Sequence, residues 1–392
     1  MLETLAVVLA GGQGTRLSPL TRGTPKPVLP FGGPYRLADF VFSNCVDSGV
    51  PTVLFVTQHC DDPVARYVER LRDTIRQARS CTLLVSGATS GNVGNATAEA
   101  VLDALPVVRR GGHRRVLILA SDHVYRMSYA SMIDYHGAVG AGVTVGTVEV
   151  PLGEAYRYGV LEAEASGRIR SFVEKPSCPP AAWGRPGRAR ASMGIYVFDR
   201  DLLEETLATD SLDASSTHDF GRDIIPRLVR SGHAWAYPFD GYWRDVGTID
   251  AYVAAHRDFL GSPTGLPLCD PRWPLRTAAW RILPGSLSVS RHGSLLSPGC
   301  LCEPGSRVRG STVSPAARIG AGAALEDCIV LDGAQVGRGA QLRRVIVDIG
   351  ETVLEGARMG WECGDEQPVT VVSGGQIWTI TQARRDPEPV LA

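Results

Sequence analysis

The stretch TLAVVLAGGQGTRL, residues 4–17, is a short apolar segment that runs directly into a glycine-rich turn. The apolar run predicts a buried strand over residues 4–10. Gly11, Gly12 and Gly14 would let the backbone approach an anion, with N–H groups directed at phosphate oxygens, and Arg16 adds a guanidinium for such oxygens. The turn is neither a Walker loop, which ends in Gly-Lys-Ser/Thr, nor the Rossmann GxGxxG. We expect a phosphate-binding turn, and a purely structural turn is the alternative.

Similar apolar runs recur along the first two-thirds of the chain. They predict strands over 52–57, 115–120, 142–150 and 192–198, with helices between them, for example over 61–79 and 95–105. Apolar strands that alternate with helices indicate an α/β fold, with a mostly parallel sheet covered on both faces. Ligands bind such sheets beyond the carboxyl ends of the strands. Functional residues are therefore expected directly after each apolar run.

Composition limits the classes of function. The length of 392 residues suggests two domains, and a net charge of −1 gives no attraction to nucleic acid or to an anionic membrane. Nine cysteines without a CxxC pair predict free thiols in a reducing compartment rather than a zinc site or a disulfide framework. The N-terminal apolar run is too short for a membrane span and lacks a basic leader, so we expect no signal peptide and a cytoplasmic protein.

The texture of the sequence changes near residue 262. Residues 262–284 are rich in proline and glycine and are expected to link a first domain over 1–261 to a second over 285–392. In the second domain an aliphatic residue recurs every six positions, with two resets of phase, at Val313, Ile319, Leu325, Leu331, then Val336, Leu342, then Val353, Met359. A six-residue period predicts a parallel β-helix. An irregular β-sandwich is the alternative.

Only two of the 40 basic residues are lysines, Lys26 and Lys175, and a proline follows each. Lysine is a compact point charge on a flexible stem, whereas arginine is a planar fork, so we expect both lysines to contact phosphates. Prolines on both sides of Lys26 restrict its backbone, and with the glycine turn and Arg16 it is predicted to clamp a triphosphate. Glu174 precedes Lys175 and could accept hydrogen bonds from sugar hydroxyls. A surface ion pair is the alternative for Glu174 and Lys175.

Two aspartates stand where a metal could bind. Asp122 directly follows the apolar run 115–120, and Asp245 lies between an aromatic residue and a glycine in YWRDVGT. Carboxylate oxygens are the hard ligands that Mg²⁺ prefers. We expect the two carboxylates, together with phosphates, to hold the metal. A helix cap is the alternative for Asp122.

The sequence as a whole resembles the bacterial glucose-1-phosphate adenylyltransferases, or ADP-glucose pyrophosphorylases, which are sugar-1-phosphate nucleotidyltransferases. The resemblance spans nearly the whole chain, through LAGGQGTRLSPLT, KPVLPFGG, YRLADF, LASDHVYRM, YGVL, FVEKP, ASMGIYVFD, SSTHDFGRDIIP and GYWRDVGTIDAY in order. It implies a Rossmann-like nucleotidyltransferase domain over 1–261, a left-handed parallel β-helix over 285–392, and a homo-oligomer, either a tetramer or a dimer. It also implies Mg²⁺-dependent transfer of a nucleotidyl group from a nucleoside triphosphate to a sugar 1-phosphate, with release of pyrophosphate. The reference case is glucose 1-phosphate and ATP giving ADP-glucose.

The resemblance implies roles for individual residues. Those expected to bind the nucleotide are Leu9, Ala10, Gly11, Gly12, Gly14, Thr15, Arg16, Lys26, Thr97 and Asp122. Those expected to bind the sugar phosphate are Gly159, Glu174, Lys175 and Ser192. The expected Mg²⁺ ligands are Asp122 and Asp245, and with Arg16 and Lys26 they form the expected catalytic set. The attacking phosphate is already an anion, so no Ser, Cys or His nucleophile is needed.

The chain departs from the family near the base and effector sites. A glutamine-rich stretch that reads adenine in the family is replaced by shorter sequence presenting Ser86, Gly87, Asn92 and Asn95, and only Thr97 and Glu99 keep the tail of that motif. Gly23 and Thr24 stand where regulated members have basic residues, and Ser121 replaces a glycine beside Asp122. We therefore expect weak or absent activation by sugar-phosphate effectors. The alternative function is a paralogue with changed base and sugar specificity, such as GTP with a valienol-type cyclitol 1-phosphate in natural-product biosynthesis.

Two other classes are disfavoured. β-Helix acyltransferases use a histidine as base, and the only histidine after residue 285 is His292, ahead of the regular repeat. An inactive regulatory subunit would not need the charged residues that this chain retains, namely Arg16, Lys26, Asp122, Glu174, Lys175 and Asp245.

Overall fold

The computed structural model describes residues 3–12, 14–57, 63–76, 81–87, 97–182, 184–261, 273–278, 288–289, 293–361, 368–380 and 389–390. The chain forms two compact units, each assembled from several segments. The first comprises Met1–Gly12, Asn44–Ser121 and Arg126–Trp243, and the second comprises Gln13–Ser43, Asp122–Tyr125 and Arg244–Ala392. Within the described ranges, no helix is long and apolar enough to cross a membrane. The predicted boundaries at 261/262 and 284/285 and most of the predicted linker fall outside the described residues and stay a prediction.

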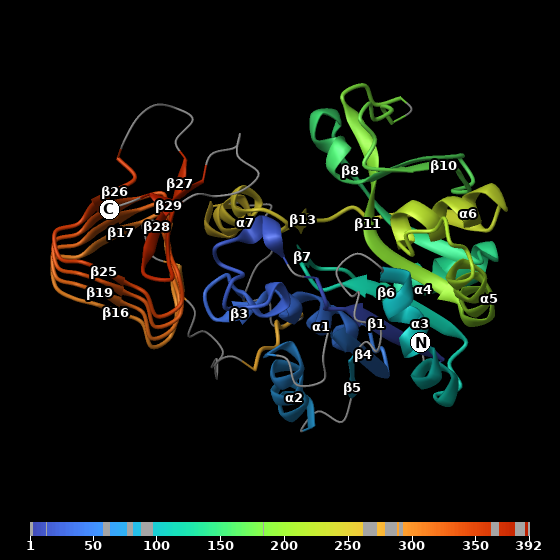
Figure 1. Cartoon of the computed structure of the whole chain (residues 1–392), viewed down its shortest axis with the longest axis horizontal. Coiled ribbons are helices and arrows are strands. Elements are labelled where there is room, and N and C mark those ends of the chain that lie inside the picture. Colours follow the sequence, from blue (N-terminus) through green and yellow to red (C-terminus); the bar gives the residue numbers. More distant parts are fainter. Residues whose placement is uncertain are drawn as a thin grey trace. The chain divides into compact units, whose positions relative to one another are not determined.

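The first unit is built on a nine-stranded sheet with the order β10-β9-β11-β6-β1-β4-β5, to which β8 is added by pairing with β11 and β12 by pairing with β8 (Figure 1). Its strands are β1 (Thr4–Leu9), β4 (Thr52–Thr57), β5 (Thr82–Gly87), β6 (Arg115–Ala120), β8 (Val143–Pro151), β9 (Gly159–Ala163), β10 (Ile169–Glu174), β11 (Arg188–Asp199) and β12 (Ala234–Pro238). Strands β5, β4, β1 and β6 run parallel, which confirms the α/β class. The long β11 runs antiparallel to β6, a direction that an apolar run does not encode.

Helices of the first unit pack on this sheet because its strands are apolar on both faces. They are α2 (Pro63–Arg76), α3 (Thr97–Arg110), α4 (Tyr129–Val139), α5 (Arg200–Ser211) and α6 (Ile225–Arg230). One face of β1, β4 and β6 shares a buried core with α3, α5 and α6, and Figure 1 shows these helices grouped beside the strands. The expected helices over 61–79 and 95–105 correspond to α2 and α3.

The second unit joins the segment after the glycine-rich turn to the β-helix. That segment forms two 3₁₀ turns, η1 (Thr15–Leu17) and η2 (Lys26–Val28), then a hairpin of β2 (Pro30–Phe31) and β3 (Tyr35–Arg36). The tip of the hairpin meets the start of the β-helix, since a Cβ placed on Gly33 would clash with Ser297 Oγ. On the same hairpin, Arg36 Nη2 lies 2.5 Å from Asp332 Oδ2, with side chains only 12% and 13% exposed. The β-helix therefore supports the hairpin that follows Lys26.

The β-helix has three sheets, in which strands of successive coils pair in parallel, while the terminal strands of the first sheet pair antiparallel. They are ordered β14-β15-β18-β21-β24-β27-β28-β29, β16-β19-β22-β25 and β17-β20-β23-β26. The strands are β14 (Ser288–Val289), β15 (Leu295–Leu296), β16 (Leu301–Cys302), β17 (Arg307–Arg309), β18 (Thr312–Val313), β19 (Arg318–Ile319), β20 (Ala324–Glu326), β21 (Ile329–Val330), β22 (Gln335–Val336), β23 (Gln341–Arg343), β24 (Val345–Val347), β25 (Thr352–Val353), β26 (Arg358–Met359), β27 (Val369–Ser373), β28 (Gln376–Ile380) and β29 (Pro389–Val390). The parallel β-helix predicted from the repeat is confirmed.

The register of the β-helix explains the phase resets in the repeat. Leu301, Arg318, Gln335 and Thr352 occupy equivalent places in successive coils, so a coil takes 17 residues. Three six-residue steps would take 18, so one step per coil is a residue shorter. The shortened step places Val330 in the central core rather than the expected Leu331, which is buried outside that cluster.

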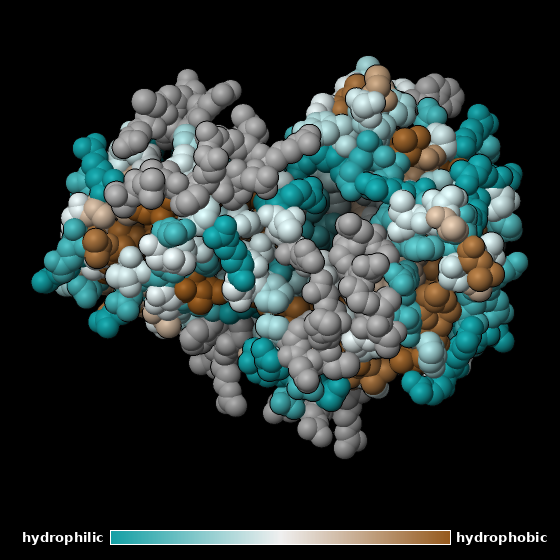
Figure 2. Space-filling model, in the orientation of Figure 1, coloured by the Kyte–Doolittle hydropathy of each residue, from teal (hydrophilic) through white to brown (hydrophobic). Residues whose placement is uncertain are grey.

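Apolar side chains are scattered on the surface. The large apolar residues that are exposed among the described ones are Tyr156, Val173, Leu212, Leu301, Ile349 and Leu354. The face drawn in Figure 2 carries several brown patches separated by hydrophilic residues. Isolated exposed apolar side chains of this kind are common and indicate no particular partner.

The close stacking of the coils generates a prediction with an internal control. A Cβ placed on Gly337 would lie 2.5 Å from the backbone nitrogen of Glu355, whereas Gly339 has a φ of +67° and nothing within 4 Å. We expect Gly337→Ala to lower the free energy of unfolding by about 2–3 kcal/mol through overpacking, and Gly339→Ala by about 1 kcal/mol through its backbone conformation. Denaturant unfolding of both variants checks this. Equal losses would contradict the steric explanation.

Candidate functional site

Lys26 is buried beside the glycine-rich turn. It begins η2, and only 7% of its surface is exposed. Gly14 caps η1 with a φ of +64°, and its carbonyl accepts a hydrogen bond from Thr21 Oγ1 at 2.9 Å. A Cβ on Gly14 would lie 3.1 Å from Lys26 Cβ, so a larger residue would push the lysine away. Thr15 and Arg16, which follow Gly14, are exposed.

Asp122 joins Lys26 to two further side chains of the second unit. Lys26 Nζ lies 2.5 Å from Asp122 Oδ2, and His123 Nε2 lies 3.4 Å from Asp122 Oδ1. Asp122, His123 and Asp245 each offer one ligand atom, and these atoms lie within 4.8 Å of one another. The cluster forms because β7 (His123–Tyr125) pairs with β13 (Trp243–Asp245). The two aspartates that the sequence placed in one site thus come together.

The electrostatics of this cluster suit a hard cation. Burial alone would raise the pKa of Asp122, but the charges of Lys26 and His123 outweigh burial and hold that pKa well below its ordinary value. The carboxylate is therefore ionised, as a metal ligand must be. Two carboxylates are hard oxygen donors, which Mg²⁺ prefers to an imidazole. Asp122 and Asp245 thus fit a hard divalent cation, and His123 is a neighbour that the sequence did not suggest.

Arg16 lies beside the loop that follows Asp245. A Cβ on Gly247 would lie 3.1 Å from Arg16 Nη2 and 3.1 Å from Asp245 Oδ1, so the guanidinium and the carboxylate flank one glycine. The DVG tripeptide at 245–247 therefore provides both an acid and the space for an arginine. The sequence analysis predicted a role for Asp245 but none for Gly247.

In the first unit, the end of β1 carries the other half of the glycine-rich turn. Ala10 N donates to the Val56 carbonyl at 2.9 Å, and Ser121 Oγ donates to the Leu9 carbonyl at 2.8 Å. Ser121, which departs from the glycine of the family, therefore links the carboxyl ends of β6 and β1. Gly12 is exposed, with nothing within 4 Å of a Cβ placed on it. Backbone at these strand ends is open to a ligand.

A second group in the first unit surrounds Glu174. Glu174 pairs in register with Gly159 across β10 and β9. A Cβ would lie 2.8 Å from Glu174 Oε2 if placed on Gly159, and 2.5 Å from it if placed on Gly221. Lys175 has a φ of +48°, and its Nζ lies 3.0 Å from Glu174 Oε1. The carboxylate thus fits between two glycines, and an exposed ammonium lies beside it.

Asp219 and Gly221 are residues of this group that sequence reasoning missed. Asp219 Oδ1 accepts from the amides of Gly221 and Arg222 at 2.9 and 3.0 Å, which caps the turn η4 (Phe220–Ile224). Thr97 Oγ1 donates to Asp219 Oδ2 at 3.1 Å. Thr97, expected to contact the nucleotide, is therefore engaged with the 219–222 turn. The segment SSTHDFGRDIIP carries a signal for this cap, because its Asp219 directly precedes the turn and aspartate is a preferred N-cap residue.

Aromatic residues complete the group. Ser192 hydrogen-bonds to Tyr196, a phenol whose pKa is raised by burial. Tyr196 stacks on Phe220, with ring centroids 5.7 Å apart and an interplanar angle of 19°. Ser192, Tyr196 and Phe220 therefore form a continuous packed set, of which the sequence had suggested only Ser192.

Some expected residues give less information. Ser86 and Gly87 end β5, while Asn92, Asn95 and His292 lie outside the described residues. The role of residues Ser86, Gly87, Asn92 and Asn95 at the base site thus stays a prediction.

Comparison with known proteins identifies the family. Residues 5–262 match the family described as nucleotidyl transferase, and residues 286–380 match the family described as GlmU-like, C-terminal hexapeptide, in line with a left-handed β-helix. The chain is 39% identical to a glucose-1-phosphate adenylyltransferase of Albidiferax ferrireducens, over 78% of this chain and 78% of that protein. The chain therefore belongs to the nucleotidyl transferase family and is a sugar-1-phosphate nucleotidyltransferase related to glucose-1-phosphate adenylyltransferase.

Proposed function

We propose that the protein transfers the adenylyl group of ATP to glucose 1-phosphate with Mg²⁺, giving ADP-glucose and pyrophosphate. The observation that carries this proposal is its relative, a glucose-1-phosphate adenylyltransferase at 39% identity over most of both chains. An oxygen of the sugar phosphate attacks the α-phosphorus of the triphosphate, and the bond to pyrophosphate breaks. The expected homotetramer or homodimer stays a prediction.

The charged residues of the second unit would favour this reaction by offsetting charge. Two polyanions must approach each other, and charge accumulates on the leaving pyrophosphate. Arg16 and Lys26 would bind phosphate oxygens, and Asp122 and Asp245 would hold the cation. When bound, Mg²⁺ would neutralise part of the phosphate charge. Because these groups are held by the turns and by β7 and β13, they need little reorganisation during the reaction.

The group around Glu174 would bind the sugar phosphate. Glu174 is an acceptor packed against two glycines, and the Lys175 ammonium is exposed next to it. A carboxylate that accepts from sugar hydroxyls fixes orientation, while a cation beside it attracts phosphate. Asp219 adds a second carboxylate near Gly221.

A second candidate function rests on the departures near the base site. The glutamine-rich stretch of the family is replaced at residues 83–100, and Ser121 stands beside Asp122. A site that lacks the polar partners of one base loses its discrimination for that base. The candidate is a paralogue that uses GTP and a valienol-type cyclitol 1-phosphate.

Asp122 and Asp245 can be separated by substitution. We expect Asp122→Asn and Asp245→Asn each to lower kcat by about 10²–10³ through lost charge stabilisation. Only Asp122→Asn should also lower the free energy of unfolding, by roughly 1–3 kcal/mol, because it leaves the buried Lys26 ammonium without its carboxylate. Pyrophosphate release and thermal unfolding measure the two effects, with Asp134→Asn as an exposed control. Near-wild-type turnover of Asp245→Asn at saturating Mg²⁺ would contradict the metal assignment.

Glu174 should affect the binding of the sugar 1-phosphate and not that of the nucleotide. We expect Glu174→Gln to raise KM for the sugar 1-phosphate about 10–100-fold, since a charged hydrogen bond contributes about 1.5–3 kcal/mol. The KM for the nucleotide should change little. Steady-state kinetics with each substrate varied in turn check this, with the exposed Glu162→Gln as control. Equal changes in both KM values would argue against a sugar-binding role.

The function itself is tested by substrate choice. Pyrophosphate release is measured with glucose 1-phosphate and Mg²⁺, and with ATP, GTP, UTP, CTP or dTTP supplied separately. We expect ATP to give the highest kcat/KM. Poor turnover of glucose 1-phosphate with all five, together with turnover of GTP and a valienol-type cyclitol 1-phosphate, would favour the second candidate.

A further inference from the structure

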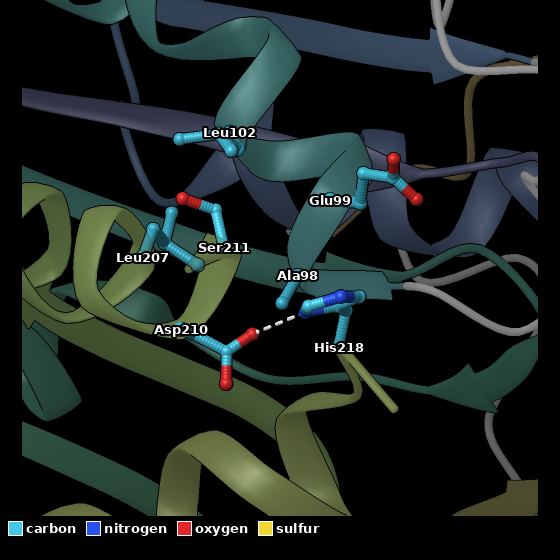
Figure 3. Close-up of a pocket in the computed structure, with 7 residues that line it drawn as sticks. All are labelled: Ala98, Glu99, Leu102, Leu207, Asp210, Ser211 and His218. Atoms are coloured by element: carbon cyan, nitrogen blue, oxygen red, sulfur yellow. Dashed lines mark hydrogen bonds and ion pairs between the residues drawn. The ribbon is translucent and has the colours of Figure 1, made fainter. Parts of the chain in front are cut away.

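A small cavity of about 80 Å³ lies between α3 and α5 in the first unit. It is lined by Ala98, Glu99, Leu102, Leu207, Asp210, Ser211 and His218. Figure 3 shows Asp210 and His218 facing each other at its edge, with a dashed line between them. His218 comes directly before Asp219, which caps the turn beside Glu174.

Asp210 is almost completely buried and is fully engaged. It is 2% exposed, its Oδ2 lies 2.8 Å from His218 Nδ1, and its Oδ1 accepts from Ser216 Oγ at 2.7 Å. The guanidinium of Arg227 lies 3.7 Å away. A buried carboxylate is stable only with such partners, so it holds His218 firmly. The same hydrogen bond raises the pKa of His218.

The backbone at His218 has an uncommon conformation. Its φ is +56°, a left-handed conformation that is unfavourable for a residue other than glycine. Its N–H donates to Ser216 Oγ at 3.0 Å, and its carbonyl accepts from Ala98 N at 2.8 Å, at the start of α3. Side chain and backbone together therefore fix the direction in which the chain leaves His218.

The chain after His218 leads to the candidate sugar site within three residues. Asp219 binds Thr97 Oγ1 and the amide of Gly221. Gly221 lies so close to Glu174 that a Cβ on it would be 2.5 Å from Oε2. A small shift of this turn would therefore change the space around the Glu174 carboxylate.

We propose that the Asp210–His218 pair is a positioning element that holds the 219–221 turn against Glu174 and so sets the affinity for the sugar 1-phosphate. This rests on the proposed role of Glu174 in binding that substrate. His218 itself contacts Asp210 and the backbone of α3, and acts on the substrate through Asp219 and Gly221.

The test uses His218→Gly in the full-length protein. Glycine accepts the positive φ without strain, and loss of the ring leaves space that adjoins the cavity. We expect faster amide hydrogen exchange at residues 220–222, about a tenfold higher KM for glucose 1-phosphate and a KM for the nucleotide within twofold of wild type. Added imidazole should reverse the first two changes by refilling the space beside Asp210.

The controls separate positioning from general damage. His233→Ala removes a ring whose Nδ1 lies 2.9 Å from Ser231 Oγ, and it should show none of these changes and no response to imidazole. Unchanged exchange at 220–222, equal rises in both KM values, or no rescue by imidazole in a folded variant would each overturn the proposal. Failure of the wild type to use glucose 1-phosphate would instead contradict the proposed function, while the exchange measurement would still report on the turn.

Discussion

The ion pair between Lys26 and Asp122 is the interaction on which the arrangement of the second unit depends. The ammonium of Lys26, a residue that is only 7% exposed, requires a counter-charge, and Asp122 supplies it at 2.5 Å. The pair brings together two chain segments that are 96 residues apart. With β13 paired to β7, the same contact brings Asp245 within reach. Removal of either charge would therefore affect both the fold of this unit and its chemistry.

The group around Glu174 depends on the size of neighbouring residues as much as on charge. Two glycines from separate elements let the carboxylate pack closely against the backbone, where a larger residue would displace it. The position of the Glu174 carboxylate therefore depends on the absence of side chains at Gly159 and Gly221. A substitution at Gly159 or Gly221 would act on Glu174 without touching its charge.

Much of this could be predicted from local sequence patterns. Strands such as 52–57 and 115–120 match the structure because runs of β-branched residues favour buried strands. Asp122 and Asp245 were identified by their place after a strand or within a glycine-bounded loop. The six-residue repeat predicted the β-helix, because each coil repeats the same core positions.

The remainder depends on contacts between distant segments. The pairing of Gly221 with Glu174 joins residues that no local pattern relates, and His218 is marked only by a backbone conformation that the sequence does not show. The antiparallel direction of β11 is likewise decided by its neighbours. The 17-residue coil was visible only as a shift of phase until the strand register explained it.

The hairpin of β2 and β3 has a consequence for how such proteins can diversify. Because Gly33 rests on Ser297 and Arg36 pairs with Asp332, the hairpin and the β-helix have complementary surfaces. An exchange of the β-helix between relatives by recombination would preserve function only where these matching residues were inherited together. In this chain the β-helix is thus a fitted partner of the hairpin rather than an interchangeable module.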